Sequence, residues 1–212
     1  MKKSFQFLLL GLIWILFCIP VVTIGAATCA VFYVGIKIQN NDQDIKLWKL
    51  FIKGLKENFV QGLLMELISI ATIGGITFLI TWTIRSDQSK FVILLAAGVA
   101  LVILIFNAFA YPIIGRYQNT FSNIMRNTII VSLTYLTDAL RLAGILVLEI
   151  ALDVLLFRLN LWAGLASLLF WPSVIFYTIS FKISKIFYKV EHPKTYEEDT
   201  PAETPSDSSA TE

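Results

Sequence analysis

The sequence predicts an all-α fold, a polytopic membrane helix bundle of about five transmembrane helices with a broken first helix and a basic amphipathic interfacial helix. Hydrophobic residues make up 57% of the 212 residues and charged residues 15%, against about 45–50% and about 25% in soluble domains. Charges gather in short basic loops between apolar blocks, and seven of the 15 acidic residues follow Val190. We therefore expect one integral membrane domain over 1–190 and a disordered acidic cytoplasmic tail over 191–212.

The first apolar segment, 5–36, carries no charge and is longer than one crossing requires. As a helix it would extend about 48 Å, whereas a bilayer core is about 30 Å thick. It is also too long for the apolar region of a cleaved export signal, about 7–15 residues. Pro20 removes a backbone donor and Gly25 lies close by, so we expect a helix break there. Thr23 and Thr28 could satisfy the backbone groups that a break frees.

Two paths remain open for this broken segment. A single broken crossing is favoured over a hairpin that returns to the same side, because half-hairpins of about 15 residues are short for spanning. The small residues that would let another helix pack closely against the segment are Gly25, Ala26, Ala27 and Ala30.

The following stretch, 44–58, predicts an amphipathic helix with an apolar stripe beside a basic face. Asp42 and Asp44 precede it as candidate N-caps. Such a helix is suited to the lipid headgroup layer, and the favoured interpretation is a structural connector parallel to the membrane. A lipid sensor or docking surface is the alternative, since each lysine near an anionic leaflet contributes about 1 kcal/mol. The candidate lipid-headgroup contacts are Trp48, Lys46, Lys49, Lys53 and Lys56.

Four more apolar blocks are each close to the length of one crossing. They cover 59–84, 91–114, 140–157 and 161–181. The long apolar run that begins at Ile129 is divided because Asp138 and Arg141 would otherwise lie within a span, and Thr137 or Asp138 would cap the second part. Close helix packing is the expected role of Gly74–Gly75.

Lysine and arginine predict the orientation, because they concentrate in cytoplasmic loops. If the first segment crosses once, eleven of them share one side, formed by 37–58, 115–139 and the C-terminus, and five lie on the other. The C-terminus is therefore expected in the cytoplasm, with the N-terminus outside. A hairpin would return Lys2 and Lys3 to the cytoplasm and leave every later segment in place.

Three carboxylates fall inside apolar blocks, where charge is costly and indicates a candidate functional site. Glu149 and Asp153 are four residues apart and share one helix face, and Glu66 lies within two turns of the cytoplasmic end of its span. Glu149 is the deepest, and we expect it to pair with Asn107 or a hydroxyl. Proton or cation transport competes here with a structural role as polar contacts between helices.

Residues for enzymatic chemistry are absent from the apolar blocks. The single histidine, His192, lies in the polar tail, and the sequence has no phosphate-binding glycine loop, nucleophile elbow or metal cluster. Cys18 and Cys29 are interpreted as small buried hydrophobes. We predict no enzymatic activity, no cofactor, no metal and no nucleic-acid partner.

Two stretches, LIWILFCIPVVTIGAATCAVFYV and LWKLFIKGLKENFVQGLL, resemble the YesL-like family of bacterial integral membrane proteins, a domain of unknown function. The matching residues are Trp14, Pro20, Thr23, Gly25, Ala26, Ala27, Thr28, Ala30, Phe51, Asn58 and Phe59. A weaker resemblance to the family lies in YPIIGRYQN, where Gly115 stands in place of the alanine that the family usually has before the arginine. Members often occur beside genes for carbohydrate-uptake ABC transporters, and the family has no agreed catalytic or ligand residues.

The resemblance implies an accessory or scaffold protein of the bacterial cell membrane, associated with carbohydrate uptake. Its expected partners are the lipid bilayer and the permease subunits of a sugar ABC transporter. The alternative, from the intramembrane carboxylates, is a small proton- or cation-coupled transporter.

Overall fold

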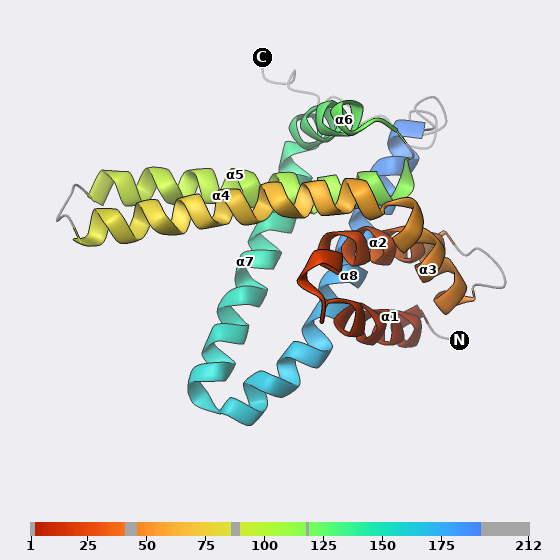
Figure 1. Cartoon of the computed structure of the whole chain (residues 1–212), viewed down its shortest axis with the longest axis horizontal. Coiled ribbons are helices and arrows are strands. Elements are labelled where there is room, and N and C mark those ends of the chain that lie inside the picture. Colours follow the sequence, from red (N-terminus) through yellow and green to blue (C-terminus); the bar gives the residue numbers. More distant parts are fainter. Residues whose placement is uncertain (1–2, 41–45, 86–89, 118, 192–212) are drawn as a thin grey trace, which may run out of the picture.

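The computed structural model describes residues 3–40, 46–85, 90–117 and 119–191, and it confirms the all-α fold class. Within these residues the elements are all helical (Figure 1). They are α1 (Lys3–Phe17), the 3₁₀ turn η1 (Val21–Thr23), α2 (Ile24–Gln39), α3 (Leu47–Glu57), α4 (Phe59–Arg85), α5 (Lys90–Arg116), α6 (Phe121–Thr134), α7 (Leu136–Leu159) and α8 (Leu161–Glu191). The predicted tail from residue 192 and the candidate caps Asp42 and Asp44 lie outside the described residues.

The first apolar segment forms an antiparallel hairpin of α1 and α2. Lys3 Nζ donates to the carbonyl of Gln39 at 3.0 Å, and Trp14 Nε1 donates to Thr28 Oγ1 at 3.1 Å. Residue numbers therefore rise along one helix while they fall along the other. The two halves of the segment therefore run in opposite directions, as in the hairpin alternative, and whether the segment crosses the membrane stays a prediction. At 15 and 16 residues, each helix is only about 23 Å long, which is short for a bilayer core of about 30 Å.

The helix break falls at Pro20, as predicted. α1 ends at Phe17, and Pro20 has extended backbone angles, φ −79° and ψ 116°. The Thr23 hydroxyl donates to the carbonyl of Phe17 and to that of Pro20. Thr28 donates to the carbonyl of Ile24 at 2.8 Å. The threonines thus satisfy carbonyl groups near the turn, which is the role expected of them.

The centre of the fold is α2, which packs against α1, α3, α4, α5 and α8. Its small residues allow this, since Ala26, Ala27 and Ala30 are fully buried. α4 approaches α2 closely, because a Cβ added at Gly62 would lie 2.7 Å from the backbone of Ala26. A Cβ at Gly115 of α5 would lie 2.6 Å from the carbonyl oxygen of Cys29. Backbones this close confirm the expected role of the small residues in α2.

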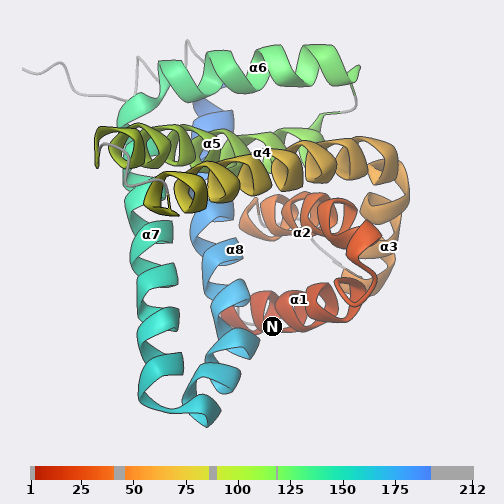
Figure 2. The ribbon, with the colours of Figure 1, turned by 60° about the vertical axis from the view of Figure 1, so that its left-hand side comes forward.

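We call α2, together with the parts of α1, α3, α4, α5 and α8 that pack against it, the base. Two long hairpins leave this base, and they point in different directions (Figures 1 and 2). One is α4 with α5, and the other is α7 with α8. α5 and α8 continue past Pro112 and Pro172. Away from the base both hairpins expose large apolar side chains, such as Phe78 and Leu148, with 67% and 68% of their surface accessible. A surface of this kind is suited to lipid.

The boundary between α6 and α7 lies at Tyr135. The split predicted near Asp138 is therefore correct in kind, but the residue before the first turn is Tyr135 rather than Thr137 or Asp138. Asp138 lies inside the first turn of α7 and forms an ion pair with Arg141 at 3.6 Å.

Within the described residues, four helical segments are long and apolar enough to cross a membrane. They are Val21–Gln39, Phe59–Arg85, Phe91–Arg116 and Leu161–Glu191. α7, which covers the predicted span 140–157, is 24 residues long and is not among them. Its charged residues are Asp138, Arg141, Glu149, Asp153 and Arg158. The predicted span therefore has the length of a crossing helix, but its helix carries more charged residues than any of the other four segments.

Candidate functional site

A cavity of about 360 Å³ lies between α4 and α5, and it gathers the most polar cluster of the hairpin. α4 contributes Glu66 and Ser69, one turn apart, and α5 contributes Asn107 and Tyr111, also one turn apart. Residues at these spacings share one helix face, so the two pairs face each other where the hairpin leaves the base. Two of the four predicted polar-site residues, Glu66 and Asn107, are thus brought together.

The four side chains form two short contacts across the helices. Tyr111 Oη donates to Glu66 Oε2 at 3.1 Å, and the Ser69 hydroxyl lies 2.7 Å from Asn107 Oδ1. The Asn107 amide donates to the carbonyl of Ile103 at 2.9 Å. Within the described part of the chain no lysine or arginine forms an ion pair with Glu66. The carboxylate therefore faces the cavity with a neutral phenol as its hydrogen-bond donor.

The turn of the first hairpin adjoins this cluster. A Cβ added at Gly25 would lie 2.1 Å from the carbonyl oxygen of Gly62 and 2.8 Å from the Cβ of Glu66. The predicted helix break therefore places the start of α2 against the helix that carries the carboxylate. An isolated carboxylate, two hydroxyls and an amide can accept a proton or coordinate a small cation.

Glu149 and Asp153 belong to a different place, on α7, and neither lines this cavity. Glu149 is 7% exposed, and in each residue one buried carboxylate oxygen has no hydrogen-bond partner among the described residues. Among the described residues no hydrogen bond joins Glu149 to Asn107, which instead bonds to Ser69 and to the carbonyl of Ile103, and the buried Oε2 of Glu149 meets no hydroxyl either. The two acids share a helix face on α7, as predicted.

The lysines predicted to contact headgroups lie on and just before α3. Lys46, Lys49, Lys53 and Lys56 are all exposed. Trp48 is 53% exposed, and its ring centroid lies 5.8 Å from that of Phe17. Phe51, buried on the same helix, lies 5.1 Å from Phe17. The helix is therefore anchored to the base by its apolar stripe and presents its basic face outward, which leaves contact with lipid as a prediction.

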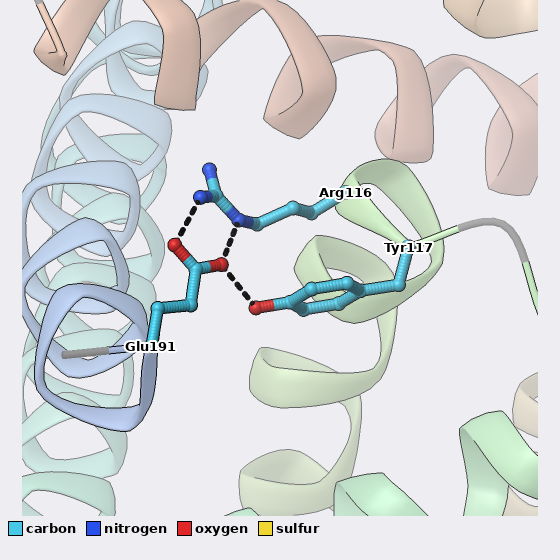
Figure 3. A network of polar contacts seen from close by, with 3 residues as sticks. All are labelled: Arg116, Tyr117 and Glu191. Atoms are coloured by element: carbon cyan, nitrogen blue, oxygen red, sulfur yellow. Dashed lines mark hydrogen bonds and ion pairs between the residues drawn. The ribbon is translucent and has the colours of Figure 1, made fainter. Parts of the chain in front are cut away.

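One polar cluster was missed by the sequence reasoning. Arg116, at the end of α5, forms two hydrogen bonds with Glu191, from Nε to Oε1 at 3.0 Å and from Nη2 to Oε2 at 2.7 Å (Figure 3). Tyr117 Oη also donates to Glu191 Oε1 at 2.7 Å. Glu191 was assigned to the disordered tail, but it is the last residue of α8. No local pattern links positions 75 residues apart, and the only sequence signal was the motif YPIIGRYQN around Arg116.

No metal centre is formed by the part of the chain that the structure describes. A search of these residues finds no group of three or more His, Cys, Asp or Glu side chains placed to hold an ion.

Comparison with known families gives one match. Residues 7–80 match the sequence model of a family described as "Protein of unknown function, DUF624". A search of curated proteins found no match, and a search of solved structures found none. The matched region contains the α1–α2 hairpin, α3 and most of α4. It ends before the second half of the Glu66 cluster, on α5.

Proposed function

We propose that this chain is a non-enzymatic accessory or scaffold protein of the YesL-like type, acting in the bacterial cell membrane beside a carbohydrate-uptake system. The carbohydrate association comes from the family resemblance of the N-terminal region, which the match over residues 7–80 supports only at the level of a domain of unknown function. The proposed partners are the permease subunits of a sugar ABC transporter.

The observation that carries a scaffold role is a set of open small-residue positions on apolar helices. A Cβ added at any of them would meet no atom within 4 Å. These positions are Gly74, Gly75, Gly98 and Gly144. Gly74–Gly75 was expected to pack closely against another helix, and within the described chain it does not. Since membrane helices associate through such small residues, these faces favour helices of a partner protein.

Site-specific photocrosslinking in native membranes tests this proposal. A photoreactive phenylalanine analogue is placed at Gly75 and, as a matched control, at Ile84 on the same helix. Nine residues are about two and a half turns, so the control faces the opposite way, and Ile84 is 64% exposed. After sugar induction we expect permease subunits to be captured from Gly75 and lipid or nothing from Ile84. Equal capture from both positions, or no permease from either, would contradict the scaffold proposal.

A second candidate function is a small proton- or cation-coupled transporter, and the Glu66 cavity favours it. Its carboxylate, hydroxyls and amide line a cavity of about 360 Å³ between two apolar helices, where ionisable groups usually mark an ion path.

A proton-flux assay tests this candidate. If the protein is a transporter, vesicles that contain it and a trapped pH-sensitive dye should pass protons faster than protein-free vesicles do. Glu66→Gln should abolish that flux, and Glu57→Gln, on exposed α3, should leave it unchanged. Glu149→Gln and Asp153→Asn test the α7 acids in the same assay. Flux no faster than in protein-free vesicles would exclude this candidate.

A further inference from the structure

A second pocket, of about 320 Å³, lies where α2, α5 and α8 meet at the base. α2 contributes Tyr33, Ile36 and Lys37, and the ends of the other two helices contribute Arg116 and Glu191. Tyr117, the residue after Arg116, also lines the pocket. The side chains of Arg116 and Glu191 are 25% and 32% exposed. A small solute at the surface can therefore reach the pocket.

The Arg116 guanidinium holds Glu191 in a two-point fork (Figure 3). Arginine uses the same fork, two parallel N–H donors in one plane, to bind carboxylates and phosphates. The Tyr117 hydroxyl adds a third donor to one carboxylate oxygen. Glu191 thus occupies a three-donor site in the way that a tetrahedral anion would.

The described residues that line the pocket carry more positive than negative charge. Arg116 and Lys37 contribute two cationic groups, and Glu191 contributes one carboxylate. The ammonium of Lys37 lies 4.8 Å from the ring centroid of Tyr33, and among the described residues it forms no ion pair. One carboxylate carries a single negative charge, whereas a phosphate monoester carries up to two and offers three terminal oxygens. A phosphate held by Arg116 would therefore bring more negative charge and more acceptor oxygens into the pocket that Lys37 also lines.

We propose that this pocket binds a phosphate group and that Glu191 is its internal competitor. The ligand is a phosphate mono- or diester, either the headgroup of an anionic phospholipid or a soluble phosphate compound. Binding displaces the Glu191 carboxylate from Arg116 and releases the end of α8 from the end of α5. The inference does not depend on the scaffold or transporter proposals, which use other surfaces.

Two substitutions move the binding in opposite directions. Glu191→Gln removes the competing charge and should raise phosphate affinity about tenfold, the worth of one charge-assisted hydrogen bond. Lys37→Gln keeps the Arg116–Glu191 fork and should lower the affinity several-fold. Asp138→Asn is the matched control, because it removes a carboxylate that pairs with Arg141 at 3.6 Å on α7, away from the pocket and from the basic face of α3. Arg116→Gln should abolish binding, but the conclusion does not rest on it, since this variant also loses the clamp between two helices.

The full-length protein is measured in two arms. In detergent, inorganic phosphate is titrated by calorimetry. In nanodiscs of phosphatidylcholine with and without phosphatidylglycerol, native mass spectrometry counts the lipids retained. Opposite shifts for Glu191→Gln and Lys37→Gln in the first arm support a soluble phosphate ligand, and the same shifts confined to the second arm support a lipid headgroup. No binding in either arm, or equal changes in Asp138→Asn, would overturn the proposal and leave Arg116–Glu191 as a structural clamp.

Discussion

At the scale of single residues, glycine marks the difference between the packed base and the open hairpins. At Gly62 and Gly115 the neighbouring backbone lies closer than a Cβ would permit. At Gly98 and Gly144 an added Cβ would meet no atom within 4 Å. Glycine therefore has a packing role in the first region and, among the described residues, none in the second.

Gly62→Ala should destabilise the protein, because α2 and α4 must separate to admit the new methyl group. Overpacking of this kind costs about 1–3 kcal/mol. Gly98→Ala is the control and should leave stability unchanged or raise it slightly, since alanine favours helix. Thermal unfolding in detergent measures both. An equal loss of stability in the two variants would mean that the contact between α2 and α4 is not as close as described.

Tyr117 carries a second prediction at this scale. Burial, followed by the neighbouring Glu191 carboxylate, raises the pKa of its phenol from 10.0 to about 12. The folded protein therefore holds the phenol proton more tightly than the unfolded chain. The resulting contribution to stability is complete below pH 10 and is lost as the pH rises from 10 to about 12.

Ultraviolet titration of phenolate formation measures this pKa as the difference between the wild type and Tyr117→Phe. We expect the missing tyrosine to titrate at about pH 12. The Glu191→Gln variant should bring the pKa of Tyr117 closer to 10, because the Glu191 carboxylate is the second largest cause of the raised pKa, after burial. Titration of Tyr117 at 10 in the wild type would show that the cluster in Figure 3 is open in solution.

At the scale of elements, local sequence patterns predicted where the helices lie, but they did not predict which helices pack against each other. The break at Pro20, the helix of 44–58 and the division before α7 all follow from proline, periodicity and charge. Glu66 and Asn107 were predicted as site residues because a carboxylate or an amide is rare inside an apolar block. Ser69 and Tyr111 were missed because serine and tyrosine are common there. Arg116–Glu191 could not be predicted, because a contact across 75 residues depends on how whole helices pack.

The basic face of α3 is an element whose lipid contact can be measured directly. Phosphatidylglycerol with brominated chains should quench Trp48 fluorescence more than brominated phosphatidylcholine does, since four lysines attract the anionic headgroup. The Trp48 signal is the difference between the wild type and Trp48→Phe. With Lys46, Lys49, Lys53 and Lys56 all replaced by Gln, the preference should vanish while the protein still inserts. A preference that survives the fourfold replacement would contradict a headgroup role for this face.

At the scale of the whole molecule, the base and the two hairpins differ in what surrounds them. α2 is enclosed by other helices, although it is apolar enough to be counted among the four candidate spans. Hydropathy measures how apolar a segment is, and cannot tell a helix surrounded by lipid from one surrounded by protein. For the same reason it could not choose between one crossing and a hairpin, nor predict that the two long hairpins diverge (Figure 1).

Cysteine labelling in intact cells tests the topology most directly. Single cysteines replace Ser4, Asn40 and Asn160, all exposed, in a chain with Cys18→Ala and Cys29→Ala, and react with a membrane-impermeant maleimide. Ser4→Cys and Asn40→Cys, at the two ends of the first hairpin, should be labelled only after the cells are opened. Asn160→Cys, between α7 and α8, should be labelled in intact cells. Labelling of Ser4→Cys in intact cells, with Asn40→Cys still protected, would mean that the first segment crosses the membrane and would contradict the hairpin.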